Sequence, residues 1–247
     1  MKYQLLLLLL AVVACRPSAQ DRISIQIPSA QTEAEYIWRN LQDTKFFDEH
    51  GYQVSLPRGP LMDELKEKAR AGKLSDEDYT RLEKFVVERV YRAEDYQAGY
   101  DKIENERSLI NQMINALNPS AYPWGFQSYD IYTINLTLYG PGGSYNPDDG
   151  SLLVYTTPQG QFKSYDNPAN TVIHEIVHIG IENSIISKYQ VPHPLKERIV
   201  DTFVSLHYGD KLPSYRVQDM GEQRSDAYLQ QPADFIALDK VVKEILQ

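Results

Sequence analysis

Residues 171–178 of this chain read Thr171-Val172-Ile173-His174-Glu175-Ile176-Val177-His178. In a helix, residues four apart project from the same side and lie about one turn apart. The imidazoles of His174 and His178 can therefore reach one metal ion, and zinc readily accepts neutral histidine nitrogen. The Val and Ile residues around them are apolar and would pack this helix into a core. The stretch predicts a rigid, partly dry metal-bearing helix.

Glu175 follows the first histidine directly. From there its carboxylate can reach water at the metal without replacing that water. Zinc lowers the pKa of the water that it binds, and a carboxylate can take the proton during attack on a carbonyl. We therefore expect Zn²⁺ as the cofactor and Glu175 as the general base.

A catalytic zinc ion needs a third protein ligand and one open position. The metzincin pattern would require Gly and His where this chain has Ile181 and Ser184, so that family is excluded. Glu182 is unsuited, because three ligands at successive helical turns would span about 12 Å of helix axis. Glu197 is the better candidate, because a break at about residues 190–194 would let the next helix fold back against the first.

Asp201 follows Glu197 by four residues and shares its helical face. A carboxylate behind a metal-bound histidine fixes the tautomer of that histidine. His-Glu-x-x-His followed by Glu-x-x-x-Asp at this spacing resembles the gluzincin metallopeptidases. The resemblance implies zinc ligation by His174, His178 and Glu197. It also implies that Asp201 orients one of the ligand histidines, and His174 is the favoured one. The asparagine that usually precedes the third ligand in that family is Lys196 here, which leaves subfamily and activity open.

The resemblance implies hydrolysis of peptide bonds in a peptide or protein substrate. Gluzincins usually supply a tyrosine or histidine that steadies the oxyanion. Tyr189 and His207 are the candidates, and the alternative for each is an ordinary packing or surface residue. Two other functions remain open. One is hydrolysis of a non-peptide amide, and the other is a non-catalytic lipoprotein with a structural or vestigial metal site that binds a protein partner.

The N-terminus has the pattern of a signal peptide. Lys2 precedes an apolar run from Leu5 to Val13 that is too short to span a bilayer. Small residues then lead to Cys15, the only cysteine of the chain, as in the lipobox of bacterial lipoproteins. This resemblance implies lipidation of Cys15 and a lipid anchor in a membrane of the bacterial cell envelope. Arg16 is not the aspartate associated with inner-membrane retention, so we expect the outer membrane.

The composition narrows the function classes. The 247 residues fit one domain, or one domain with a helical appendage. The net charge of −9 argues against nucleic acid as a partner, because nucleic-acid binding requires basic patches.

Residue patterns divide the chain into four segments. We assign a lipoprotein signal peptide to residues 1–14, a tether to 15–31, a helical N-terminal region to 32–118 and a zinc metallopeptidase-like domain to 119–247. Within the N-terminal region, helices are predicted over 32–48, 61–71 and 76–117. Ser75 caps the last of these helices and Asn118-Pro119 ends it.

Strands are predicted in the second half of the chain, where Tyr132, Ile134 and Leu136 alternate with polar residues. A loop rich in glycine and proline separates this strand from a second one at 151–157. The second strand is either an edge that pairs with an extended peptide or an ordinary sheet strand. Helices follow over 168–189, 193–206 and 232–246. The expected fold is α+β, with a small mainly antiparallel sheet, an active-site helix pair and additional N- and C-terminal helices.

Overall fold

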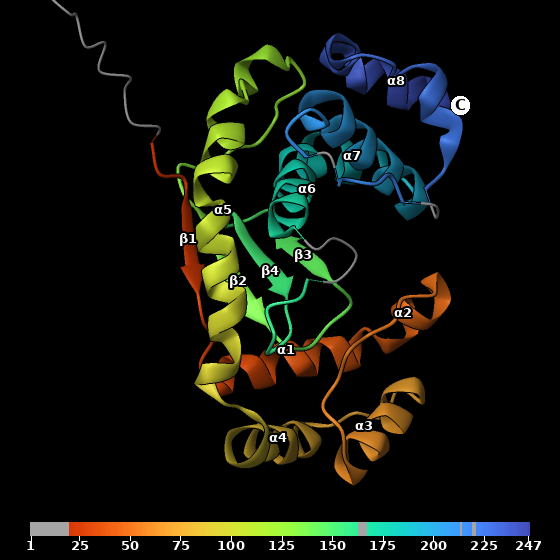
Figure 1. Ribbon diagram of the computed structural model, residues 1–247. Helices are drawn as coiled ribbons and strands as arrows, with labels where there is room; N and C mark the ends of the chain where they lie inside the picture. The colour runs from red at the N-terminus through yellow and green to blue at the C-terminus, as the bar shows by residue number, and fades with distance from the viewer. Residues whose placement is uncertain (1–19, 163–166, 213, 219–220) are drawn as a thin grey trace, which may run out of the picture.

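The strands of the computed structural model form one mixed sheet in the order β1-β2-β4-β3 (Figure 1). The structure describes residues 20–162, 167–212, 214–218 and 221–247, so the predicted signal peptide and Cys15 lie outside the described residues. The strands are β1 (Ile23–Gln26), β2 (Tyr132–Thr137), β3 (Gly143–Asn146) and β4 (Ser151–Tyr155). The α-helices are α1 (Ala30–Gln42), α2 (Thr44–His50), α3 (Pro60–Arg70), α4 (Asp76–Phe85), α5 (Gln97–Ala116), α6 (Pro168–Ile181), α7 (His193–Tyr208) and α8 (Leu238–Ile245). The expected α+β class is confirmed.

The prediction of a mainly antiparallel sheet is wrong. β1, β2 and β4 run parallel, and only β3 is antiparallel to its neighbour β4. The chain passes through α1 to α5 between β1 and β2, and a crossover of that length allows parallel pairing. After β2, the chain reverses in β3 at the outer edge, and β4 then returns between β2 and β3. The period-2 pattern of a strand shows which face is buried, but it carries no information about strand direction.

Both edge strands lie in segments where the sequence predicts no strand. β1 lies within the predicted tether and pairs from Ile23 to Gln26 with β2, so the tether assignment is wrong from residue 23 onward. β3 lies within the loop rich in glycine and proline. Because β4 is flanked by β2 and β3, it is an interior strand and cannot be a peptide-binding edge. Among the described residues, the outer side of β3 has no strand partner.

The helix predicted over 76–117 is interrupted. α4 begins at a capping box formed by Ser75 and Asp78 and continues into a π-helical turn at Val86–Val90. Tyr91 and Arg92 are extended, and α5 follows a short 3₁₀ turn. α4 packs against α1, whereas α5 packs against α6 and β1. Tertiary packing therefore breaks a segment that local propensity leaves continuous.

α5 and α6 cover one face of the sheet (Figure 1). On that face Tyr132, Ile134 and Leu136 are fully buried, whereas Thr133 and Asn135 between them are half-buried. Each fully buried aliphatic side chain of this core contributes about 1.5–3 kcal/mol. The same core includes α7 and α8, and it therefore fixes α6 and α7 against the sheet.

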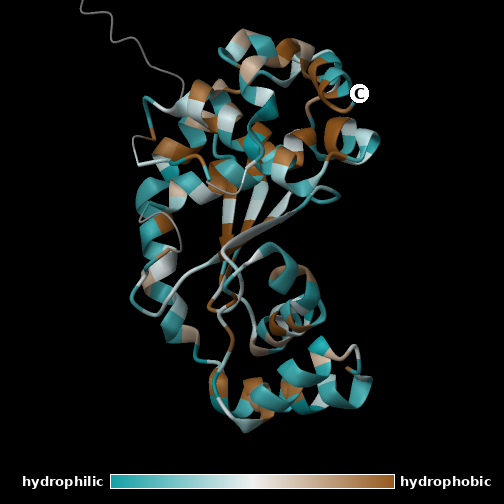
Figure 2. Cartoon of the chain, turned by 90° about the vertical axis from the view of Figure 1, so that its right-hand side faces the viewer, coloured by the Kyte–Doolittle hydropathy of each residue, from teal (hydrophilic) through white to brown (hydrophobic). Residues whose placement is uncertain are grey.

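The N-terminal helices α1, α3 and α4 have an apolar cluster of their own, formed mainly by Ile37, Leu41, Met62, Leu65, Leu82 and Val86. In Figure 2 these helices lie at the bottom, with hydrophobic residues toward one another and hydrophilic residues outside. Polar contacts tie them to the sheet. Glu33 Oε1 accepts hydrogen bonds from the Leu138 amide at 2.9 Å and the Thr137 hydroxyl at 3.1 Å. Ser55 and Gly140 also pair through their backbones.

Glu33 should make the stability of the fold depend on pH. Burial raises the pKa of this carboxyl from 4.5 to about 7, against the opposing effect of its hydrogen bonds. Because the folded-state pKa lies above the unfolded value, the stabilisation by protonation is fully present below pH 4.5 and is lost as the pH rises through about 7. The loss is about 3 kcal/mol.

Glu33→Gln removes this titration and keeps the shape of the side chain. In urea unfolding curves between about pH 4 and pH 8.5, we expect the wild type to lose about 3 kcal/mol relative to the variant. Comparing the two proteins cancels the titration of other groups. Parallel pH profiles would show that Glu33 does not carry this dependence.

Candidate metal centre

α6 begins where the sequence predicts, but it ends at Ile181 and gives way to a π-helical turn inside the segment predicted as one helix over 168–189. The Asn167 side chain accepts a hydrogen bond from the Ala169 amide, and Pro168 occupies the first helical position. Val172, Ile173, Ile176 and Val177 are at most 2% exposed, so the apolar residues around the histidines pack into the core. Gly180 lies against the ring of Phe126, where a Cβ atom would collide with that ring. The helix is therefore held closely on all sides, as a rigid metal site requires.

The chain turns back between α6 and α7. After a π-helical turn at Glu182–Ser187, Gln190 adopts a left-handed backbone conformation with φ of 52°. Among the described residues it is the only non-glycine residue with a positive φ. α7 then starts at His193 and packs against α6. This fold-back confirms the break predicted at residues 190–194 and brings Glu197 to the histidines.

His174, His178 and Glu197 form one buried cluster. The two histidine Nε2 atoms are 3.0 Å apart, and each lies 3.4 Å from Glu197 Oε2. In a tetrahedral zinc site with bonds of about 2.0–2.1 Å, neighbouring ligand atoms lie about 3.3–3.4 Å apart. Three such atoms fit one ion with a fourth position open toward the cavity, and the donor set of two imidazoles and one carboxylate suits zinc. These residues therefore could hold a metal ion.

Behind His174 a hydrogen-bond chain fixes its orientation. His174 Nδ1 lies 2.7 Å from the Tyr215 hydroxyl, which donates to Asp201 Oδ1 at 2.6 Å. Asp201 Oδ1 is itself 3.3 Å from His174 Nδ1, and Asp201 Oδ2 accepts from the Gln218 amide. A proton on Nδ1 leaves Nε2 free for a metal. Asp201 thus lies behind His174, where the sequence predicted it, and Tyr215 is an added member of the chain.

His178 is held by stacking instead. Its Nδ1 atom is buried and has no hydrogen-bond partner among the described residues. The ring of Tyr145, on β3, stacks on the imidazole with centroids 4.7 Å apart and an angle of 7° between the planes. The Tyr145 hydroxyl donates to Glu182 Oε2 at 2.5 Å. Glu182 therefore anchors Tyr145 and is not part of the metal cluster. This agrees with the helical spacing, which argues against Glu182 as a ligand.

Burial and mutual charges set the pKa values in the cluster. Burial opposes the charged form of His174, but Asp201 and Glu197 outweigh it and raise its pKa to about 10. Burial lowers the pKa of His178 to about 4. Burial would raise the pKa of Glu197, but the two histidines hold it well below 4.5. Without metal, a proton on His174 therefore pairs with Glu197, and a metal ion would have to displace that proton.

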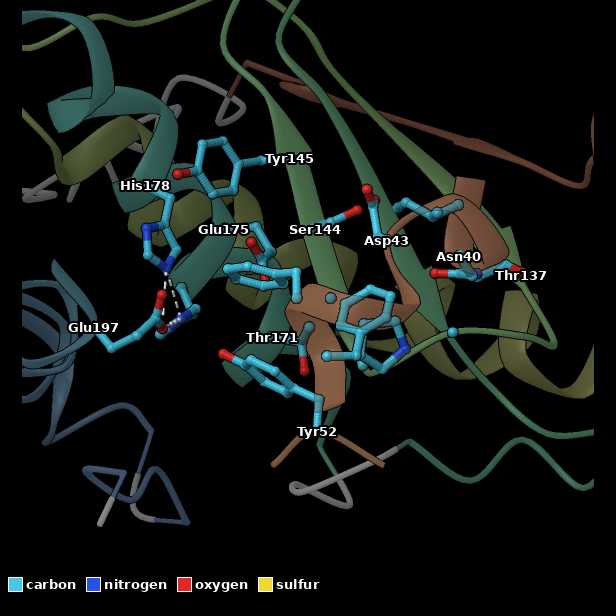
Figure 3. Close-up of a pocket in the computed structure, with 18 of the residues that line it drawn as sticks. Asn40, Asp43, Tyr52, Thr137, Ser144, Tyr145, Thr171, Glu175, His178 and Glu197 are labelled. Carbon is cyan, nitrogen blue, oxygen red and sulfur yellow. Dashed lines mark hydrogen bonds and ion pairs between the residues drawn. The ribbon is translucent and has the colours of Figure 1, made fainter. Parts of the chain in front are cut away.

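Glu175 projects from α6 into a cavity of about 440 Å³ (Figure 3). Its carboxylate has no hydrogen-bond partner among the described residues, and burial raises its pKa to about 7. β3 passes directly over it: a Cβ atom at Gly143 would collide with Glu175 Oε1 and with the Thr171 methyl group. Glycine at this position therefore lets the edge strand approach the carboxylate.

The opposite wall of the cavity comes from α1, α2 and the segment that follows α2, with Asn40, Phe46, Phe47 and Tyr52 among the lining residues. The Tyr52 hydroxyl lies 2.8 Å from His193 Nε2, and His193 Nδ1 lies 3.5 Å from Glu197 Oε1. Figure 3 shows Tyr52 and Tyr145 on two sides of the cavity. His193 is four residues before Glu197 on α7, so helical spacing could have identified it. No sequence signal identifies Tyr52 or Tyr145, which come from distant segments.

Tyr189 and His207 do not line this cavity. The aromatic ring of Tyr189 lies against the ammonium groups of Lys188 and Lys243. His207 stacks on Phe203 and lies 3.1 Å from the Tyr122 hydroxyl. Their assignment as candidate oxyanion stabilisers is therefore not supported, because both side chains point into other parts of the molecule.

Comparisons with protein-family models, curated proteins and solved structures find no match to this chain. Within the described residues, no helix is long and apolar enough to cross a membrane. The functional argument therefore rests on the geometry of the site.

Proposed function

We propose that this chain is a zinc-dependent hydrolase of peptide bonds. The observation that carries the proposal is a buried cluster of two histidines and one glutamate in one cavity with Glu175, whose carboxylate has no hydrogen-bond partner among the described residues. A purely structural zinc site would be closed by four protein ligands. Here three residues converge, and the fourth side faces a space of about 440 Å³.

The residues around the cluster suit hydrolysis of an amide. When bound, a zinc ion supplies Lewis-acid polarisation of the carbonyl and lowers the pKa of water. Glu175 would take a proton from the attacking water and pass it to the amine nitrogen as the C–N bond breaks. In place of Tyr189 and His207, Tyr52 would donate its one hydroxyl proton to the developing oxyanion, with the phenol oxygen accepting a hydrogen bond from His193 Nε2.

β3 supports a peptide as the substrate. It is the edge strand nearest Glu175, and its outer side has no strand partner among the described residues. An extended peptide could add to that edge through backbone hydrogen bonds and lie with a carbonyl near the cluster. The peptide-pairing edge that the sequence predicted at residues 151–157 is therefore proposed at residues 143–146 instead.

We also propose that a lipid on Cys15 anchors the protein to the bacterial outer membrane. Seven residues, 16–22, separate Cys15 from the start of β1, and a chain of that length reaches at most about 28 Å. The anchor would hold the sheet close to the membrane surface. Labelling with a palmitate analogue should mark the wild type and not Cys15→Ser, and equal labelling of both proteins would rule the anchor out.

The function is tested by cleavage of a peptide library and mass spectrometry of the products. Protein loaded with zinc should cleave, protein stripped by a chelator should not, and added zinc should restore cleavage. No cleavage by the loaded protein, or cleavage indifferent to the chelator, would overturn the proposal. If the protein cleaves only non-peptide amides, the proposed substrate class is wrong and the proposed zinc-dependent hydrolysis stands.

A further inference from the structure

Lys196 places a positive charge in the wall of the cavity. It lies in the first turn of α7, directly before the ligand Glu197, and its side chain is 18% exposed. Its Nζ atom is 3.3 Å from the Tyr145 hydroxyl, 3.7 Å from Glu197 Oε1 and 5.5 Å above the centre of the Tyr145 ring. The ammonium group thus faces both β3 and the metal cluster.

This charge is poorly compensated by the protein. The positive end of the helix dipole disfavours a cation in the first turn of α7. Of the three hydrogen bonds that an ammonium group can donate, Lys196 makes only the one to Tyr145 within the part of the chain that the structure describes. Glu197 is its nearest carboxylate, but that group also faces His174, His178 and His193. A bound metal ion would take most of the remaining negative charge of Glu197.

The other charged side chains of the cavity do not neutralise the positive charge of Lys196. Arg39, on the α1 wall, donates to the Ser144 hydroxyl at 3.2 Å and has no ion pair among the described residues. Asp43 and Glu175 complete the charged lining with Glu197. With a divalent cation bound, the cavity therefore has two lysine or arginine charges and two metal charges against three carboxylates, a net charge of +1. Among the described residues, the one carboxylate paired with this mostly buried cation is shared with three histidines, and such incomplete compensation favours an anionic ligand.

We propose that Lys196 binds a carboxylate of the substrate, so that the site prefers acidic peptides. This inference rests on the proposed peptide hydrolysis and names its substrate class. The carboxylate would accept hydrogen bonds from Nζ beside Tyr145 on β3. It comes either from a Glu or Asp side chain or from the free C-terminus of the peptide, and both groups present the same chemistry to Lys196.

Peptide pairs test the preference and identify the source of the carboxylate. One series moves a single Glu through the positions around a cleaved bond, each peptide paired with its Gln counterpart. A second series compares a free C-terminus with its amide. We expect one series to show a preference of about tenfold to hundredfold in kcat/KM for the carboxylate, the value of a charge-assisted hydrogen bond. Equal cleavage within every pair would overturn the inference and leave the hydrolase standing.

Substitutions then test whether Lys196 causes the preference. Lys196→Met should remove the difference within each pair, and Lys196→Arg should retain it. Lys188→Met is the matched control, because Lys188 also lies over a tyrosine ring but outside the cavity. An equal loss of activity on both members of each pair in Lys196→Met would assign Lys196 to the reaction itself and contradict substrate recognition. Zinc content measured on every variant excludes an effect through Glu197.

Binding separates this inference from the proposed function. Glu175→Gln protein is titrated calorimetrically with the same peptide pairs, so no cleavage is needed. Tighter binding of the carboxylate peptide, lost in Glu175→Gln with Lys196→Met, would support Lys196 even if the wild type cleaves nothing. If neither member of any pair binds, or both bind equally, the inference fails whatever the activity. Lys196→Gln serves as a second neutral variant if Lys196→Met folds poorly.

Discussion

Replacing Glu175 by Gln is expected to lower peptide cleavage by about 10²–10⁴-fold, while zinc stays bound. General-base catalysis by a positioned side chain contributes about that factor. The carboxylate has the three properties that the role requires. It lies in the cavity with the cluster, it has no hydrogen-bond partner among the described residues, and burial raises its pKa to about 7. Glutamine keeps the shape of the side chain but cannot accept the proton.

Steady-state kinetics on the best library peptide, with zinc content measured on the same samples, check this expectation. Glu33→Gln is the matched control, because it also replaces a buried glutamate but lies outside the cavity lining. It should keep its activity at about pH 6, where the loss of the buried titration leaves the variant at least as stable as the wild type. Undiminished cleavage by Glu175→Gln with full zinc would mean that another group accepts the proton.

The cluster that could hold a metal ion could be predicted from the sequence because helical spacing is a local rule. His174 and His178 are one turn apart, and a single turn near Gln190 decides whether α7 folds back to bring Glu197 to them. Asp201 then follows one turn further along the same face of α7. The same arithmetic excludes His207, which lies ten residues, or about 15 Å of helix axis, beyond Glu197. The prediction for His207 rests on its closeness to Glu197 in sequence. Its position along the helix axis decides whether the side chain can reach the site, and that position is too far away.

The walls of the cavity could not be predicted in this way. Tyr145 reaches His178 only because β3 forms the edge of the sheet, and β3 has four half-buried residues without the alternation that marks a strand. Tyr52 reaches His193 from a segment 141 residues earlier in the chain. These contacts depend on strand order and on the packing of the N-terminal helices. The local periodicity of hydrophobic residues indicates neither property. The parallel pairing of β1, β2 and β4 could not be predicted for the same reason.

Glu197→Ala is expected to weaken zinc binding by two to three orders of magnitude. Structural sites with four protein ligands bind zinc with about 10–16 kcal/mol, or about 3–4 kcal/mol per ligand. At about 1.4 kcal/mol per tenfold change, the loss of one ligand gives that factor. Asp201→Asn should cost less, about 10–100-fold, because Asp201 does not touch the metal position and orients His174 directly and through Tyr215. This order of effects distinguishes a ligand from a residue that supports one.

Competition with a chelator of known zinc affinity measures these constants, and thermal unfolding gives a second readout without activity. Zinc at about 1,000 times its dissociation constant should stabilise the wild type by about 4 kcal/mol. The same zinc concentration should stabilise Glu197→Ala far less. His207→Gln, which alters a histidine outside the cavity, should behave as the wild type. If Glu197→Ala keeps wild-type zinc affinity, or if Asp201→Asn weakens binding more than Glu197→Ala does, Glu197 is not the third ligand. The separations of 3.4 Å to both histidines would then reflect only the ion pair of the metal-free cluster.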